Sequence, residues 1–137
     1  MKTLANCTPR EFAAQTVKIK KAAEKWLKLT DIIKIRKRVP EDLPEVKEGM
    51  TPSDVENIMA RRKEIIREKA LENMSAIFDA CFEKHPDETL EVIALCCFLE
   101  PEKLDEYETA DLLAAALDMV ENETVMRFFT LLMRLAN

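Results

Sequence analysis

Residues 92–99 have the sequence VIALCCFL, the longest uninterrupted apolar run in the chain. A helix formed by this run is apolar on every side, which is typical of a helix buried in a protein core. Pro86 opens the helix, and Asp87 and Glu88 lie in its first turn, where the helix dipole favours acidic residues. Pro101 ends the segment, and eight apolar residues are too few to cross a bilayer. We therefore expect a central buried helix.

The chain has one glycine, Gly49, among 137 residues. Tight β-hairpins and phosphate-binding loops both rely on glycine, because glycine accepts positive φ and lets the backbone approach a ligand closely. This scarcity disfavours hairpin-rich β folds and nucleotide-binding loops. The apolar fraction of 47% is ordinary for a globular protein of one domain. We predict an all-α fold, a compact bundle of about five to six helices.

Two shorter helices are expected after the central one. Thr109 is the expected N-cap of the first and Asn122 of the second. The final helix carries apolar residues over more than half of its circumference. Two interpretations stay open: both sides pack inside the bundle, or the surplus is exposed and binds a partner.

The first helix begins at a capping-box pattern, Thr8 with Glu11 three residues later, and Pro9 suits the first helical position. Apolar residues then recur at helical spacing through Trp26, and lysines occupy much of the remaining surface. The simplest interpretation of these lysines is a solvated face.

Residues 32–39 are rich in β-branched and basic residues, which favours a strand, but the sequence offers no convincing second strand to pair with it. Two interpretations of this segment therefore stay open, a short helix or an extended connector. Residues 40–52 hold three prolines and the glycine and are expected to form a loop. We therefore divide the single domain into a basic helical segment (1–39), a linker loop (40–52) and an acidic helical core (53–137). The loop could set the N-terminal helix apart from the rest.

A long helix is expected to begin at Thr51-Pro52-Ser53-Asp54, which repeats the chemistry of the first helix start, and to run to about His85. Apolar residues trace one face of it, but Arg62 and Lys69 interrupt a strict heptad. A long parallel coiled coil is therefore disfavoured.

Charge is divided unevenly along the chain. Residues 1–40 carry eleven basic and three acidic residues, a net charge of +8, whereas residues 41–137 carry ten basic and twenty-three acidic residues, a net charge of −13. This division is compatible with a basic arm for nucleic acid. The same charge division is equally compatible with attraction between the two parts of one chain or between copies of the chain. Self-association is therefore a further possibility.

Catalytic and metal-binding patterns are scarce. The one histidine, His85, precedes a proline at an expected helix end, and Cys96 and Cys97 are adjacent, without the pairwise spacing of a zinc site. Cys7 and Cys81 complete the cysteine set, which we interpret as reduced and mostly buried thiols. We expect no enzyme activity, no metal and no cofactor. The first residues lack an apolar signal-peptide stretch, so a cytoplasmic location without membrane insertion is expected.

Nucleic-acid binding is the main alternative from another functional class. Lys34, Arg36, Lys37 and Arg38 follow the lysines of the first helix, and a dense basic patch suffices to neutralise phosphates. The overall charge of −5 and the absence of a glycine-bearing helix-turn-helix turn make this alternative less favourable.

The chain resembles tail assembly chaperones of long-tailed bacteriophages (siphophages) and related prophages. The resemblance is carried by LANCTPxEF (residues 4–12), Ile19, Trp26-Leu27, IRKRVP (35–40), IFDACFEKHPDET (77–89), LCCFLEPE (95–102) and FFTLL (128–132). These stretches span most of the chain and contain no catalytic signature.

The resemblance implies a non-enzymatic protein of the bacterial host cytoplasm that is absent from the mature virion. Such chaperones bind the tape measure protein, a long and partly apolar helical chain, and help to bring tail tube subunits to it. In many phages a ribosomal frameshift produces a longer form, to which this chain would be the short counterpart. A minor structural protein of the phage particle is a further alternative.

A partner surface, if it exists, is expected on the final helices. The candidate partner-binding residues there are Leu113, Leu117, Phe128, Phe129 and Leu132. Val17 and Trp26 of the first helix are second choices, and each of these residues is also compatible with a place in the core.

Overall fold

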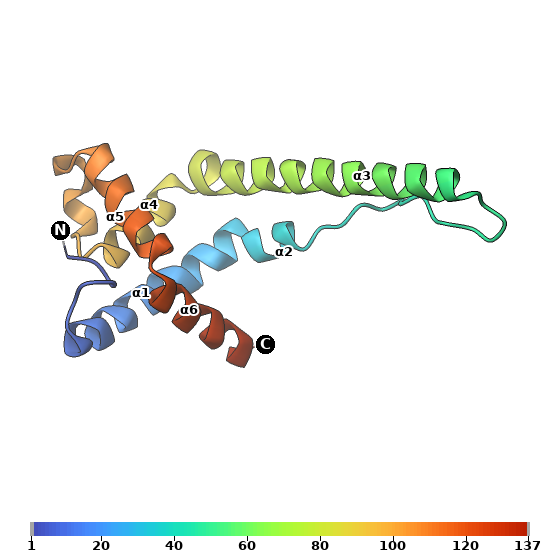
Figure 1. The fold of residues 1–137 in the computed structure, drawn as a ribbon. Helices are drawn as coiled ribbons and strands as arrows, with labels where there is room; N and C mark the ends of the chain where they lie inside the picture. The colour runs from blue at the N-terminus through green and yellow to red at the C-terminus, as the bar shows by residue number, and fades with distance from the viewer. Residues whose placement is uncertain (1, 137) are drawn as a thin grey trace. The chain divides into compact units, whose positions relative to one another are not determined.

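The computed structural model describes residues 2–136 of the chain, without the side chains of residues 132, 133 and 136. These residues form helices and no strand, so the all-α prediction is confirmed (Figure 1). The α-helices are α1 Pro9–Thr30, α2 Ile32–Arg36, α3 Pro52–Phe78, α4 Pro86–Cys96, α5 Thr109–Glu121 and α6 Glu123–Ala136. A π-helix, η1 Asp79–Lys84, follows α3, and a 3₁₀ segment, η2 Pro101–Glu106, follows α4.

The chain forms two compact units. The first comprises Met1–Lys28 and Pro86–Asn137, and the second comprises Leu29–His85. These boundaries differ from the expected segments, because the division falls in the last turn of α1, and the expected linker 40–52 lies wholly inside the second unit.

The core of the first unit is built around α4, as the apolar run predicts. Ala94 and Cys97 are fully buried there. The buried residues around them are Leu99, Leu112 and Ala115, with Leu90, Ile93, Leu104 and Tyr107 packed against the cluster. Small side chains at positions 94 and 97 let neighbouring elements approach α4 closely, and removal of this apolar surface from water stabilises the unit.

The end of α4 is closed by a Schellman motif in which a phenylalanine takes the usual glycine position. Phe98 has φ 58°, and the Leu99 N–H donates to the Ala94 carbonyl at 2.9 Å. Gln15 of α1 is buried, and its Nε2 donates to the Leu95 carbonyl at 2.6 Å. The terminal carbonyls of α4 are therefore satisfied by the chain's own turn and by a side chain from α1.

Helix α1 packs with the C-terminal helices of the first unit. The indole Nε1 of Trp26 donates to Oγ1 of the buried Thr89 at 2.9 Å, and the Phe12 ring meets Phe128 edge-on with centroids 5.5 Å apart. Aromatic pairs in this geometry add to the energy of area burial. The N-terminal helix thus belongs to the same packed unit as α4–α6.

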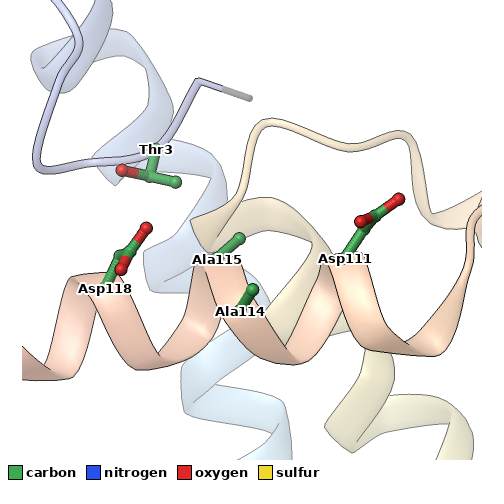
Figure 2. A pocket seen from close by; sticks show the side chains of 5 residues that line it. All are labelled: Thr3, Asp111, Ala114, Ala115 and Asp118. Carbon is green, nitrogen blue, oxygen red and sulfur yellow. The ribbon is translucent and has the colours of Figure 1, made fainter.

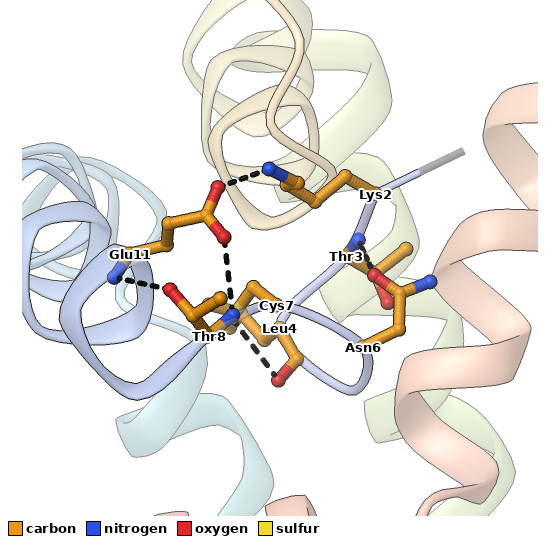
Figure 3. Close-up of polar contacts among 7 residues, drawn as sticks. All are labelled: Lys2, Thr3, Leu4, Asn6, Cys7, Thr8 and Glu11. Atoms are coloured by element: carbon orange, nitrogen blue, oxygen red, sulfur yellow. Dashed lines mark hydrogen bonds and ion pairs between the residues drawn. The ribbon is translucent and has the colours of Figure 1, made fainter.

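The segment before α1 is held by local polar contacts (Figure 3). Thr8 and Glu11 form the expected capping box, with Thr8 N–H donating to Glu11 Oε1 at 3.1 Å and Glu11 N–H donating to Thr8 Oγ1 at 3.3 Å. Lys2 pairs with Glu11, and the Thr3 N–H donates to Asn6 Oδ1 at 2.8 Å. Much of the LANCTPxEF stretch therefore has a local structural purpose.

In the second unit, α2 packs against α3, and Ile35 of α2 is buried. Residues 32–39, for which the sequence left two options, form the short helix α2 and then an extended exit. Residues 37–50, which we call the strap, have no regular structure and lie alongside α3 in Figure 1. Gly49, with φ 83°, turns the chain back toward the start of α3.

Two of the three remaining cap predictions are confirmed. Thr51 and Asp54 form a capping box at the start of α3, and Asn122 Oδ1 accepts the Val125 N–H at 3.0 Å at the start of α6. The assignment of Thr109 as a cap is wrong. Glu108 has the extended conformation of an N-cap, so the helix already includes Thr109, and the Glu108 side chain makes no capping bond.

Candidate partner-binding surface

Helix α5 carries an apolar stripe that is more than half exposed in the described part of the chain. Leu113, Leu117 and Val120 are spaced to share one face, and their exposed fractions lie between 54% and 59%. Leu112 and Ala115 of the same helix point into the core of the first unit. The helix therefore buries one apolar side and leaves an adjoining apolar side in water.

Helix α6 carries a second stripe, formed by Phe128, Leu131 and Leu135. Leu131 is 54% exposed and Leu135 is 75% exposed, whereas Phe128 is partly covered by its edge-on contact with Phe12. Arg127 adjoins this stripe, four residues before Leu131, and pairs with Glu123 at 3.0 Å. The apolar surface of α6 is thus wider than its packing within the unit requires.

The predicted partner-binding residues fall into different environments. Leu113 and Leu117 belong to the α5 stripe, Phe128 to the α6 stripe, and Phe129 is half-buried. The side chain of Leu132 lies outside the described residues. Val120, Leu131 and Leu135 were not among the predicted residues, although Val120 lies three residues after Leu117, and Leu131 and Leu135 lie three and seven residues after Phe128.

The two α1 candidates differ from each other. Trp26 is half-buried and hydrogen-bonded to Thr89, so it anchors α1 to α4. Val17 is 61% exposed but stands alone among lysines on the solvent side of its helix. A single exposed apolar residue of this kind is normal and marks no surface.

The solvent side of α1 is basic. Four lysines spaced three or four residues apart are exposed there: Lys18, Lys21, Lys25 and Lys28. This spacing places them in one row along the helix, as expected for a solvated face and as required for an electrostatic contact with an anion.

Two open hollows adjoin α5 and α6. The first, of about 370 Å³, is lined by Thr3, Asp111, Ala114, Ala115 and Asp118 (Figure 2). The second, of about 440 Å³, lies beside Phe12, Asn122, Val125 and Phe128. Asp111 and Asp118 are exposed carboxylates two turns apart, and the described residues contain no group of side chains placed to hold a metal ion.

The cysteines are positioned as structural thiols. Burial, with a smaller contribution from the adjacent Cys97, raises the pKa of the Cys96 thiol to about 11, and burial also raises the pKa of Cys97. Nucleophilic cysteines need a lowered pKa, since the thiolate is the reactive form. Both thiols are therefore suited to packing and poorly suited to attack on a substrate.

Glu11 is the acidic group with the clearest perturbation. Its ion pair with Lys2 and the N–H of Thr8 lower the pKa of this exposed carboxyl. These contacts explain the shift fully as helix capping, so it points to no reaction centre.

None of the described helices combines the length and apolar character needed to span a bilayer. Comparisons with models of protein families, with curated proteins and with solved structures found no match to this chain.

Proposed function

We propose that this protein is a non-enzymatic tail assembly chaperone that binds the tape measure protein and helps to recruit tail tube subunits. The proposal starts from the resemblance of the sequence to that family. The single structural observation that supports it best is the pair of exposed apolar stripes on α5 and α6. The protein would act in the host cytoplasm and be absent from the finished virion.

Holding an apolar helix in solution requires a complementary apolar face on a helical protein. The α5 stripe offers three aliphatic side chains over two turns, and the α6 stripe offers three more, including an aromatic ring. Burying such side chains against a partner is favourable by roughly 25 cal/mol per Å² of apolar surface. The net charge of −13 on residues 41–137 would keep a complex soluble.

Co-expression tests the proposal directly. The full chain would be produced together with a tape measure protein, and the soluble complex measured after affinity purification. We expect Leu117→Asp and Leu131→Asp to abolish solubilisation of the long protein while the variants stay folded. Val17→Asp is the matched control, because Val17 is as exposed but isolated on α1. Failure of the wild-type chain to form a complex, or equal loss with Val17→Asp, would contradict the proposal.

The runner-up function is a small nucleic-acid-binding regulator. The row of exposed lysines on α1 favours it, because phosphate contacts need accessible cations. Gel retardation of DNA and RNA across a salt series separates the two functions. Retardation at physiological salt that is lost when Lys21 and Lys25 are changed to Glu would support the regulator.

The third option is a minor structural protein of the phage particle. Retention of the chain in purified virions would favour it over an assembly factor, and so mass spectrometry of virions distinguishes the two.

A further inference from the structure

Helix α3 has a face whose residues are spaced like one side of a helix–helix interface. The positions alternate by three and four residues along most of the helix: Val55, Ile58, Arg62, Ile65, Lys69, Asn73 and Ala76. We call this set the α3 stripe. It extends over about 32 Å at 1.5 Å per residue, which is the length of three heptads.

The strap is anchored to the α3 stripe by two long-range hydrogen bonds. Asn73 Nδ2 donates to the Arg38 carbonyl at 2.9 Å, and an Arg62 guanidinium N–H donates to the Pro44 carbonyl at 2.8 Å. The donors are three helical turns apart on α3, and the acceptors are six residues apart on the strap. The strap therefore runs along the stripe in the direction opposite to α3.

The strap covers the α3 stripe only in part. Asn73 is buried at 8% exposure, and the other residues of the stripe are half-buried. Val39 and Val46 of the strap are themselves exposed, so these two valines add little buried apolar area to the contact with α3. Segments with few buried apolar contacts open at low free-energy cost.

Two cations lie within the apolar pattern, seven residues apart. Arg62 is occupied by a strap carbonyl, and Lys69 pairs at 3.2 Å with Glu72, an exposed residue of its own helix. In a helix pair, residues at this spacing occupy equivalent positions, where charged side chains select the partner. A second copy in parallel register would set Arg62 against Arg62 and Lys69 against Lys69, which disfavours that occupant.

We propose that the α3 stripe is a binding site for an amphipathic partner helix with acidic residues seven positions apart, and that the strap leaves the stripe when this helix binds. The carboxylates of the partner face Arg62 and Lys69, and its apolar residues cover Val55, Ile58 and Ile65. The strap acts as a weak internal competitor. This inference does not depend on the α5 and α6 stripes, which lie in the other unit.

The test uses the full chain and a fluorescein-labelled amphipathic peptide of about three heptads. The peptide has leucines on one face and two glutamates seven residues apart on that face, and a comparison peptide has lysines in their place. Fluorescence anisotropy gives the affinities. We expect the glutamate peptide to bind, the lysine peptide to fail, and Asn73→Ala to tighten binding of the glutamate peptide about fivefold, as loss of one strap hydrogen bond predicts.

Arg61→Ala is the matched control. Arg61 neighbours Arg62 in sequence but is exposed and pairs with Glu64 of its own helix at 3.1 Å. This variant removes one positive charge without touching the strap, so the affinity should not change. Ile65→Asp should abolish binding. By contrast, Leu117→Asp should leave it intact, which separates failure of this inference from failure of the proposed function.

Hydrogen exchange supplies the second measurement. In Asn73→Ala, amides of residues 38–50 should exchange faster while those of α3 stay protected, and peptide binding to the wild type should produce the same acceleration. Equal or weaker peptide affinity in Asn73→Ala would overturn the proposal. If Asn73→Ala also loses the protection of its α3 amides, the test is made on the wild type alone. Exchange of the strap amides that does not change when the peptide binds would then overturn the proposal as well.

Discussion

A pair of leucine substitutions on one helix tests whether the α5 stripe is a surface. Leu112 is 8% exposed and belongs to the core of the first unit, whereas Leu117 is 59% exposed. Truncating a buried leucine costs about 2–5 kcal/mol, and an exposed one usually changes stability by less than about 0.5 kcal/mol. Both Leu112→Ala and Leu117→Ala keep helix propensity high, so propensity does not confuse the comparison.

The expected shifts follow from the size of the protein. A chain of 137 residues has an unfolding entropy of about 0.3 kcal/mol/K near its melting temperature. A loss of about 3 kcal/mol in Leu112→Ala should then lower Tm by about 10 °C, and Leu117→Ala should lower it by less than about 2 °C. Thermal unfolding followed by circular dichroism measures both.

Leu117→Ala, which should change stability little, should weaken partner binding. Full burial of a leucine is worth about 1.5–3 kcal/mol, and roughly three-fifths of Leu117 remains to be buried, which leaves about 1–2 kcal/mol for a partner to gain. Loss of that energy should weaken a complex about 5- to 30-fold. If Leu117→Ala lowers Tm as much as Leu112→Ala does, the stripe is part of the packed interior and the reasoning is refuted.

Three further outcomes are expected. Asn122→Ala should cost about 1 kcal/mol and speed amide exchange at Val125, since it removes the N-cap of α6; unchanged exchange would show that the cap is dispensable. Asp31→Gly should raise stability by about 0.5–1 kcal/mol, because Asp31 holds φ 54° without a capping bond, and a lower Tm would count against strain there. Iodoacetamide at about pH 8 should label Cys96 roughly 100-fold more slowly in the folded chain than in urea, because few thiols with a pKa of about 11 are ionised. Labelling as fast as in urea would contradict this burial. Because the pKa of Cys96 is raised, the folded state keeps a proton that the unfolded state releases, and the free energy of unfolding should therefore fall as the pH rises from about 9 to 11.

The sequence predicted those features that depend on neighbouring residues. The capping boxes at Thr8 and Thr51 and the cap at Asn122 each need only a short polar side chain and a nearby N–H, so the local pattern was sufficient. A core around α4 was predictable from its apolar run, but burial on every side was not confirmed, since Thr89 and Ala94 are the buried residues of this helix.

The rest depends on contacts between distant residues. Arg62 and Asn73 interrupt an apolar pattern, and nothing in that pattern says that backbone carbonyls 18 and 35 residues away will accept their protons. Likewise, Phe128 and Leu131 belong to the same apolar stripe of α6. Phe128 is partly covered because Phe12 of α1 contacts its ring, whereas Leu131 stays more exposed. Periodicity identifies an apolar face, but the neighbour that covers it is set by tertiary structure.

The scarcity of glycine also has an energetic consequence. Three described residues have left-handed backbone with positive φ, and only one of them is a glycine, Gly49. The other two are Asp31 and Phe98. Each non-glycine residue in that conformation costs about 1–2 kcal/mol. At Phe98 the cost is offset by burial of Leu99 against Ala94 and by the turn hydrogen bonds, and so the motif is fixed by the core. Asp31 is exposed and its side chain makes no capping bond, so neither of these contributions offsets the cost there.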